Sequence, residues 1–521
     1  MAFMYYSRKQ ILRLGAIILL LLLLFPSTIS ADEGLGLLEA VTLTLSHQPS
    51  ILIQKQQVEI DRGAYMVASG DFDTELNASA SYQHSDQPLS PADEELLNSS
   101  NQIINEDFYS LGTTTLLRSG IEISPSISVT NTDISTSDYD SVASGRVDFS
   151  ILFPLMKGRG EEATAAEEMA LKSDLEVSNL TLRHVISEKV LDTVVGYWTY
   201  VAAKKQYDQL IASENRAEKM VESTQELIKA DEVPAVDIQR MQANLSDKSS
   251  GRVIGLQNVI QAQQQMGLTI GLDYSQFDDV KDPTLDFPDL LEESLARLPD
   301  RLQSLLDISL AMRTDYQARL KDQQSKQILI TAAKNKLKPD LNLNVNFGFS
   351  GQDEGRELRS YYSSFSRDIP GISQAISLEY SFRPSNTSAQ GVFLQKKAAL
   401  SQSKIETDDI IRNIYSNVTV TLESVRNQSY ALQKAREAVK AYSKAVQSEK
   451  EKFLLGMSTL LDIIDTDDRL TDALFKEIDT HLQVAIAIAT LRFETGTIVT
   501  YADGKYSVDM KTLMSLPDSI D

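Results

Sequence analysis

The most extended pattern in the chain is helical, with apolar residues recurring at steps of three, four and five. It covers about 161–230 and again about 389–455, with polar and charged residues between the apolar ones. This spacing puts the apolar side chains on one stripe, so each stretch predicts a single helix of roughly 100 Å at about 1.5 Å per residue. A helical bundle core would explain the stripe but not this length, and we therefore expect coiled-coil-like packing.

Four shorter helical patterns accompany the two long ones. Each is about half as long, and they cover residues 37–72, 234–268, 302–338 and 459–493. Two short helices stacked end to end would match one long helix and leave little of its apolar stripe unpaired. The chain is therefore expected to be mainly α, with each long helix flanked by shorter partners.

A second pattern alternates with period two, as in a β-strand with one apolar and one polar face. It is clearest in "RVDFSILFP" (146–154) and in "ISLEYSFRP" (376–384). The apolar face would pack on another sheet in a water-soluble sandwich, whereas in an outer membrane it would face lipid. The alternation alone leaves both arrangements open.

The helical and strand patterns occur twice, which indicates an internal duplication. Residues 65–82 align with 330–347, and both stretches change from helical spacing to alternation at the same point. Residues 233–245 align with 458–470 at a smaller offset, so the first copy carries a longer insertion. We assign the insertion to 83–144, a stretch rich in Ser, Thr, Asp and Asn that predicts a loop with one hairpin around "LLRSGIEISPSISVT".

Composition narrows the possible partners and the compartment. The 521 residues include no cysteine and carry a formal charge of −23, which argues against a nucleic-acid partner because phosphate binding needs clustered Lys and Arg. Basic residues precede an apolar run at 14–25, and "PSTISA" follows it. This predicts a secretory signal peptide cleaved near Ser30 or Ala31, with an uncleaved membrane anchor as the alternative.

Four stretches together resemble the TolC-like outer membrane efflux protein family. They are "AVTLTLSHQPSILIQKQQVE", "FPLMKGRG", "NKLKPDLNLNVNFGFSG" and "EKFLLGMSTLLDIIDTDDRLTDA". The resemblance covers roughly residues 34–499, and the order and duplication of the motifs are more specific than any single motif.

The resemblance implies a fold class that is mainly α with a small β part. The chain would consist of a duplicated helix-strand-strand-helix-helix repeat. Three protomers would form an outer-membrane β-barrel, to which each protomer gives about four strands, and a long α-helical coiled-coil barrel would continue it. The expected parts are a signal peptide (1–30), a first repeat (31–271), an equatorial connector (272–300), a second repeat (301–498) and a tail (499–521).

The resemblance also places two turns, each of which connects two helices of a hairpin, at the periplasmic tip of the tube. The first contains Asp231 and Pro234, and the second contains Gly456. Just beyond the second turn, Asp462 and Asp465 are three residues apart and share a helix face. They match the family's paired acidic residues at the pore entrance, where six carboxylates from three copies would favour cations. The alternative is that acidic residues simply complement the dipole at a helix start.

Asp237 matches a further acidic position of the family near the first turn. It is a candidate for the tip gate, holding the tip closed by pairing with a neighbouring helix. Here the sequence departs from the better-known members, because Phe453 and Ser458 occupy the region where those members often carry Tyr and Arg as gate partners. The partner of Asp237 is therefore not predicted.

Signals for catalysis are weak, and we expect neither an enzyme nor a cofactor or metal site. The four histidines are scattered, and "DTDD" lacks the glycine and distal Glu of a calcium loop. The resemblance implies a passive exit duct for efflux or type I secretion. Its partners would be outer-membrane lipid, a periplasmic adaptor and an inner-membrane transporter of the ABC or RND type. The alternative is an exported coiled-coil scaffold without a pore.

Overall fold

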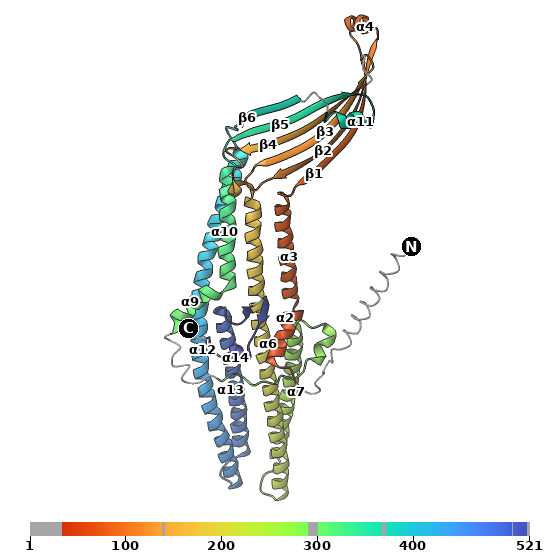
Figure 1. Ribbon diagram of the computed structural model, residues 1–521. Coiled ribbons are helices and arrows are strands. Elements are labelled where there is room, and N and C mark those ends of the chain that lie inside the picture. Colours follow the sequence, from red (N-terminus) through yellow and green to blue (C-terminus); the bar gives the residue numbers. More distant parts are fainter. Residues whose placement is uncertain (1–33, 138–140, 290–300, 367–370, 503, 518–521) are drawn as a thin grey trace, which may run out of the picture. The chain divides into compact units, whose positions relative to one another are not determined.

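The computed structural model describes residues 34–137, 141–289, 301–366, 371–502 and 504–517 (Figure 1). The predicted signal peptide, its cleavage site and the alternative anchor lie outside these residues, as do positions 290–300 of the connector. The chain forms two compact units. The tip unit comprises the described parts of 1–44, 193–288 and 432–485, and the sheet unit comprises those of 45–192, 289–431 and 486–521.

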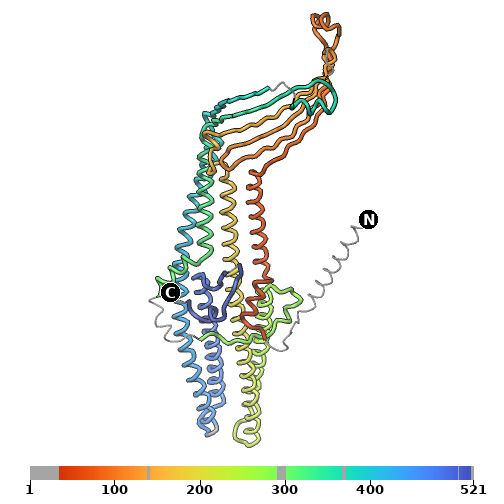
Figure 2. The backbone as a smooth tube through the Cα atoms, viewed as in Figure 1, coloured from red at the N-terminus to blue at the C-terminus, as the bar shows by residue number. Residues whose placement is uncertain are grey.

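The two long helices predicted from the sequence are confirmed. They are α6 (Ala166–Lys229) and α12 (Thr387–Leu454), and the four-residue helix α5 (Glu161–Thr164) precedes α6. Each long helix is followed by a partner of about half its length, α7 (Asp237–Ile270) or α13 (Leu460–Glu494). Figure 2 shows how the chain reverses direction between each long helix and its partner.

Each predicted opening helix is divided into two. The pairs are α2 (Leu37–His47) with α3 (Pro49–Gly70), and α9 (Leu302–Met312) with α10 (Thr314–Asn335). The first break has a local cause, because Pro49 lacks an N–H and Gln48 caps α3 by accepting a hydrogen bond from the backbone N–H of Ser50. Both halves of the chain thus place a short and a longer helix before their strands.

Two matched glycines end the partner helices in the same way. Gly271 after α7 has φ +79° and Gly496 after α13 has φ +70°, a left-handed conformation that favours glycine. The residues that follow them, Leu272 and Thr497, each donate a backbone hydrogen bond to a carbonyl five positions back. These are Schellman caps, and the 225 positions between the two glycines equal the offset between the aligned stretches 233–245 and 458–470.

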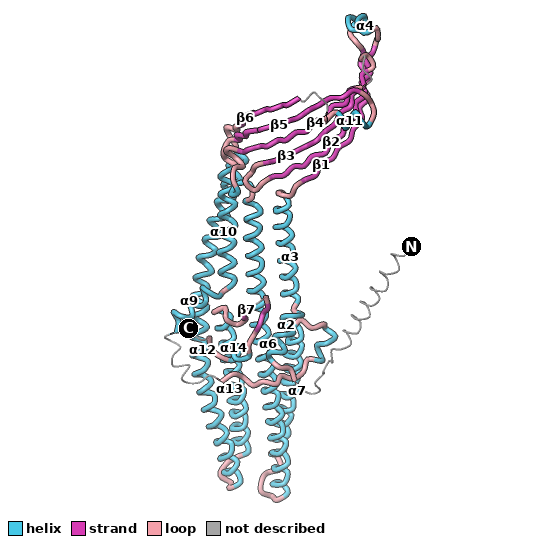
Figure 3. Tube along the Cα trace, in the orientation of Figure 1, coloured by secondary structure: helices cyan, strands magenta, loops and turns pink. Residues whose placement is uncertain are grey.

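Strands β1 to β6 form one antiparallel sheet with the order β1-β2-β3-β4-β5-β6 (Figure 3). Their bounds are β1 Glu75–Pro88, β2 Asn101–Leu116, β3 Glu122–Ile134, β4 Val142–Pro154, β5 Asp340–Glu354 and β6 Gly371–Ser381. Two short helices interrupt the connections, α4 (Pro91–Leu97) between β1 and β2, and α11 (Leu358–Ser363) between β5 and β6.

The predicted loop at 83–144 is wrong. The end of β1, all of β2 and β3, and the start of β4 occupy most of it, so the described part of one chain contributes six strands to this sheet rather than about four. The predicted hairpin is correct, with its turn at 117–121 between β2 and β3. The polar composition misled the loop prediction because one face of the sheet is built of Ser, Thr and Asn, residues that also signal loops.

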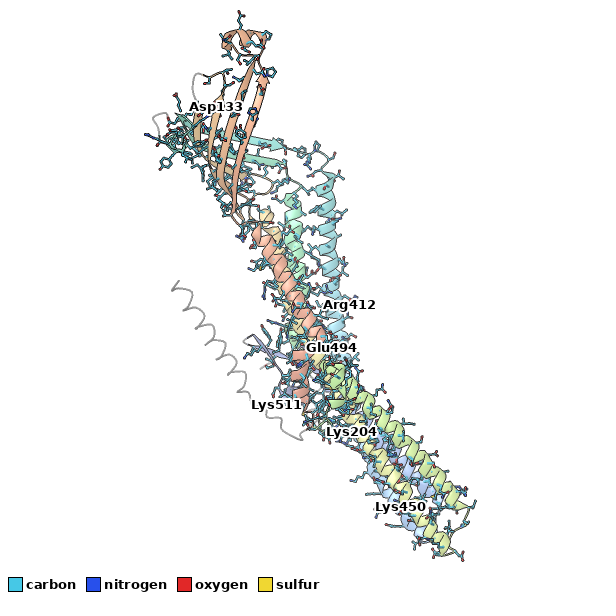
Figure 4. The ribbon with its side chains drawn as sticks, turned by 90° about the vertical axis from the view of Figure 1, so that its right-hand side faces the viewer. Asp133, Lys204, Arg412, Lys450, Glu494 and Lys511 are labelled. Carbon is cyan, nitrogen blue, oxygen red and sulfur yellow. The ribbon has the colours of Figure 1, made fainter. Side chains whose placement is uncertain are left out.

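Aromatic residues form the core of the tip unit, where the connector crosses α6. Tyr197 and Trp198 are fully buried, and the Tyr197 hydroxyl accepts hydrogen bonds from the backbone N–H groups of Thr284 and Leu285. Lys204, labelled in Figure 4, pairs with Asp282 at 2.8 Å. The described part of the connector, which includes the 3-10 helix η1 (Tyr274–Asp279), is therefore fixed to the helices by both packing and charge.

The tail carries a small hairpin and a short helix. These are β7 (Thr500–Ala502), β8 (Lys505–Ser507) and α14 (Met510–Met514). Arg492 near the end of α13 donates hydrogen bonds to the carbonyls of Ser515 and Leu516, which fixes the tail to the sheet unit. Among the described residues, no helix combines the length and the hydropathy needed to cross a membrane.

Candidate pore entrance and membrane-facing sheet

The two predicted tip turns have closely related backbone geometry. Asp231 has φ +55° and Gly456 has φ +71°, so both occupy the left-handed region. In each turn the next residue, Glu232 or Met457, donates a 2.9 Å backbone hydrogen bond to a carbonyl five positions back. Asp231 thus takes the conformation that glycine takes in the second turn, and an L-residue adopts it at a cost in free energy.

Asp462 closes a capping box at the start of α13. Its carboxylate accepts hydrogen bonds from the backbone N–H of Thr459 at 3.0 Å and from its hydroxyl at 2.6 Å, while the Asp462 N–H donates back to that hydroxyl at 3.3 Å. These hydrogen bonds from Thr459 lower the pKa of the Asp462 carboxyl below its usual value. The helix-start role is therefore present within one chain.

Asp465 lies on the same exposed face of α13 as Asp462, as the spacing predicts. The Arg469 side chain, one turn further on, donates to the Asp465 carboxylate at 2.8 Å. Both side chains remain more than half exposed. One chain thus offers two solvent-facing carboxylates at this end of α13 and one guanidinium that partly offsets them.

Asp237 is the first residue of α7, and its charged neighbour is on its own helix. The guanidinium of Arg240 lies 3.5 Å from the Asp237 carboxylate, an i,i+3 pair. Pro234 contributes to the same turn, because its carbonyl accepts the Asp237 N–H at 3.0 Å. No ion pair from Asp237 to another helix occurs within the described part of this chain, and its role as a gate residue stays a prediction.

Ion pairs that were not predicted from the sequence join two helical hairpins, α6 with α7 and α12 with α13. Arg216 on α6 donates to Asp467 on α13 at 2.7 Å and to the Thr471 hydroxyl at 3.1 Å. Lys248 on α7 pairs with Asp468 on α13. No sequence signal names these partners, because the pairs depend on which faces of α6, α7 and α13 meet in space.

An apolar cluster lies between the turns and these ion pairs. Val221, Met241 and Leu460 are buried there, one each from α6, α7 and α13. Partly buried residues complete the cluster: Met220, Ile238, Leu245, Phe453 and Ile464. With increasing distance from the turns, the two hairpins are thus held together first by apolar packing and then by ion pairs.

The six-stranded sheet has one continuous apolar face. Residues directly opposite each other on neighbouring strands point to the same side. One such row crosses all six strands and is apolar throughout: Ala78, Leu111, Ile127, Val147, Phe349 and Ile372. The larger side chains of this face are exposed over 40 to 76% of their surface in residues such as Phe149, Ile127 and Ile376.

The adjacent row points to the opposite side and is polar or small. Its members are Asn77, Gly112, Ser126, Asp148, Gly348 and Ser373. An ion pair between Arg146 and Asp148, at 2.6 Å, lies on this polar face. The sheet is therefore a single layer of strands with an apolar surface on one side and a polar surface on the other.

The apolar face is covered only near the α4 end of the sheet. There the hydroxyl of Tyr361, a residue of α11, accepts a hydrogen bond from the Asn131 side chain, and the Tyr361 ring meets that of Tyr109 edge-on at 6.2 Å between centroids. Nearer the helices, the exposed apolar residues of the sheet have no second layer among the described residues of the sheet unit. A water-soluble sandwich, the first of the two arrangements left open by the sequence, is thus not formed within this unit.

Candidate chemistry is sparse in the described residues. No group of three or more His, Asp or Glu side chains with metal-binding geometry occurs there. His84 contacts the Asn105 side chain at 2.7 Å, and His184 lies 3.9 Å from the Asp315 carboxylate. His84 thus makes a hydrogen bond, and His184 packs against the ring of Phe493 with 5.6 Å between the ring centroids.

Comparison with solved structures identifies the fold. The outer-membrane channel OprN matches with a TM-score of 0.64 at 13% identity, over 88% of this chain and 90% of that chain. The CmeC outer membrane channel of Campylobacter jejuni matches with a TM-score of 0.61 at 12% identity, over 88% and 85%. The outer membrane protein VceC of Vibrio cholerae matches with a TM-score of 0.61 at 12% identity, over 88% and 96%.

The chain shares the fold of these outer-membrane channels. The resemblance to the TolC-like family that the four motifs indicated is confirmed at the level of the fold. No protein-family model matches the sequence, and no curated protein matches it significantly.

Proposed function

We propose that the protein is a trimeric outer-membrane channel that serves as the passive exit duct of an efflux pump or a type I secretion system. Its strands form the wall of a barrel in the outer membrane, and its helices continue the duct into the periplasm. At the tip it docks a periplasmic adaptor and an inner-membrane transporter, of the ABC or RND type. The shared fold and the chemistry of the sheet support this proposal.

The observation that carries the proposal is the pair of adjacent rows that cross the sheet. A wall between lipid and a water-filled lumen needs apolar side chains on one side and polar ones on the other, in strict alternation. The apolar row through Val147 and Phe349 and the polar row through Asp148 and Gly348 meet this requirement across all six strands. A periplasmic scaffold without a pore has no use for an exposed apolar sheet face, which invites aggregation in water.

The tip supports a role as the entrance of the duct. Three copies would place six carboxylates, those of Asp462 and Asp465, around the axis, and a ring of negative charge favours cations. Opening requires the hairpins to separate, and the Arg216–Asp467 and Lys248–Asp468 pairs oppose that movement within each copy.

A matched pair of substitutions in β5 tests the membrane role. Phe347 points to the apolar face and its neighbour Asn346 to the polar face, and both are exposed. Phe347→Arg places a charge in lipid at a cost of about 2–4 kcal/mol near the bilayer centre, whereas Asn346→Arg faces the lumen. We expect Phe347→Arg to be lost from the outer-membrane fraction and Asn346→Arg to remain there as a trimer.

Equal behaviour of the two variants would contradict the proposed orientation of the sheet. A wild-type protein that fractionates as a soluble monomer would contradict the channel itself. The two results are distinguishable, because the first leaves the wild-type protein in the membrane and the second does not.

A further inference from the structure

The turn of the β2–β3 hairpin was predicted from the sequence, but the full length of its two strands and their place in the sheet were not. The residues of β2 and β3 follow the same facing rule as their neighbours. Leu111 and Ile127 extend the apolar row, and Gly112 and Ser126 extend the polar row, in unbroken register with β1 and β4. A hairpin that only packed against the sheet, without pairing within it, would not be expected to continue both rows.

The turn of this hairpin is also fixed to the helices of the sheet unit. Arg118 makes a bidentate pair with the largely buried Glu168 of α6, through hydrogen bonds of 2.7 and 2.6 Å. The Arg118 guanidinium lies over the ring of Phe72 at 4.7 Å, and Ser69 of α3 donates to the same carboxylate at 2.9 Å. A planar, two-point contact of this kind sets the position of the turn along the strand direction.

A close backbone approach reinforces this contact. The carbonyl of Ser119 accepts the Gly160 N–H at 2.9 Å. Gly120 has φ +89°, and a Cβ there would come within 2.1 Å of the Gly158 carbonyl oxygen. The turn is thus seated against the start of the long helix, where the turns of a barrel wall meet the helical part of the chain.

We propose that β2 and β3 are wall strands of the barrel, so that each copy contributes six strands and the trimer closes an eighteen-stranded barrel. β1 of one copy then pairs with β6 of the next. The inference rests on the proposed trimeric channel. It departs from the four strands per copy that the resemblance implied.

The edges of the sheet support this closure. Because the six strands alternate in direction, β1 and β6 run antiparallel to each other, so the edge of one copy fits the opposite edge of the next. Unpaired edge N–H and C=O groups cost several kcal/mol each in lipid, so both edges need partners. One copy cannot close on itself, because about eight strands is the smallest barrel known in membranes.

The two edge strands, β1 and β6, also match in the alternation of apolar and polar residues between the two faces of the sheet. β1 presents Leu76 and Ala78 on the apolar side, and β6 presents Ile376 and Leu378 on that side. In an antiparallel pairing that sets these residues opposite one another, both faces continue across the junction between copies. Neither edge strand contains a proline at its centre that would block ladder hydrogen bonds.

The consequence is a wide lumen. Barrel diameter grows roughly linearly with strand number, so eighteen strands give a diameter about 1.5 times that of twelve and about twice the cross-section. Barrels of about this size hold an open aqueous channel. The barrel end of the duct would therefore admit bulky solutes or extended polypeptide, and selection of cargo would fall to the tip.

Paired cysteines test the hairpin's place in the wall, since the natural chain has none. Ser79→Cys with Ser110→Cys links β1 to β2, and Ser124→Cys with Ser150→Cys links β3 to β4, because these residues are directly opposed. We expect nearly complete disulfide formation for both pairs in the membrane-inserted protein. As a control, Ser79→Cys combined with single cysteines along β4 should not cross-link within a chain, because β1 and β4 are about 14 Å apart.

The junction between copies is tested by combining Ser79→Cys with Ser373→Cys, Ser377→Cys or Ser381→Cys in β6. At least one combination should give a ladder of products that ends at a covalent trimer. A ladder that ends at a dimer would contradict the trimeric channel on which the inference rests. Cross-linking of β1 directly to β4 would overturn the inference, because β2 and β3 would then lie outside the wall.

Failure of the inference and failure of the proposed function give different results. In the first case the wild-type protein is still a trimer in the outer membrane, but electron microscopy of that trimer shows twelve strands instead of eighteen. In the second case no trimer is found in the membrane. Strand counting uses the unmodified protein, so it decides the inference even where a cysteine variant fails to assemble.

Discussion

Arg216 on α6 and Asp467 on α13 are joined by a 2.7 Å hydrogen bond although 251 positions separate them in the chain. The Asp467 side chain is only 14% exposed and that of Arg216 26%, so the pair is shielded from solvent. Breaking a shielded pair leaves a charge without its partner. The free-energy penalty of that unpaired charge is larger than the stabilisation that the intact pair provides. The pair therefore opposes any separation of the two helical hairpins.

Asp467→Asn should loosen the contact between α6 and α13. It removes the charge but keeps the shape, and we expect a loss of roughly 1–3 kcal/mol in the free energy of local opening. Faster hydrogen exchange of the α13 amides around 467–471 measures it. Asp465→Asn is the matched control, because its i,i+4 pair with Arg469 is exposed to solvent and such pairs contribute little to stability. Equal effects of the two variants would show that the Arg216 pair does not hold the hairpins.

Asp462→Asn combined with Asp465→Asn should weaken the preference of the channel for cations and its block by multivalent cations. Asn keeps an acceptor oxygen for the Thr459 cap, so the change isolates charge from helix capping. Arg469→Gln should act in the opposite direction, because it leaves Asp465 unpaired. Reversal potentials in a salt gradient measure both effects.

Unchanged selectivity in the double variant would return Asp462 and Asp465 to a helix-start role alone.

Acid should release the turn of the β2–β3 hairpin. The hydrogen bonds from Arg118, helped by that from Ser69, lower the pKa of the Glu168 carboxyl below its usual value. A lowered folded-state pKa stabilises the fold above the ordinary Glu pKa of about 4.3, and this contribution is lost as the pH falls through the lower folded value. Glu168→Gln should therefore unfold at a lower temperature than wild type at neutral pH, and the difference should shrink below about pH 4. A difference that persists unchanged in acid would assign the effect to packing instead.

Introducing glycine in the first tip turn and removing it from the second should change the stability of these turns in opposite directions. Asp231→Gly relieves a left-handed conformation and should stabilise the first turn by up to about 1 kcal/mol, whereas Gly456→Ala should destabilise the second by about 1 kcal/mol or more. Hydrogen exchange of the amides in 228–232 and 453–457 measures each turn locally. The expected change in protection is about fivefold per kcal/mol, in opposite directions. The same sign in both variants would contradict the shared geometry of the turns.

The sequence predicted the helices well because their signals are long. An apolar stripe sustained over the length of α6 or α12 cannot be mistaken for a strand. The two tip turns were placed for the same reason. Their sequences interrupt an otherwise continuous helical pattern at matched positions of the two copies.

The extra strands and the inter-hairpin ion pairs could not be predicted in the same way. Along β2 and β3, residues such as Ser110 and Ser126 belong to a polar sheet face, and they give the composition of a loop when they are read singly. The partners Arg216 and Asp467 lie far apart in the chain, and only the packing of the two hairpins brings them together. Long-range pairing is a property of the fold, so no local pattern encodes it.

The most direct test of the channel is electrical. The mature protein, purified from outer membranes and added to a planar lipid bilayer, should insert as a trimer and produce discrete current steps. Those steps should be cation-selective, and Asp462→Asn with Asp465→Asn should reduce their selectivity. A protein that stays soluble and monomeric, and leaves the bilayer without current steps, would contradict the account.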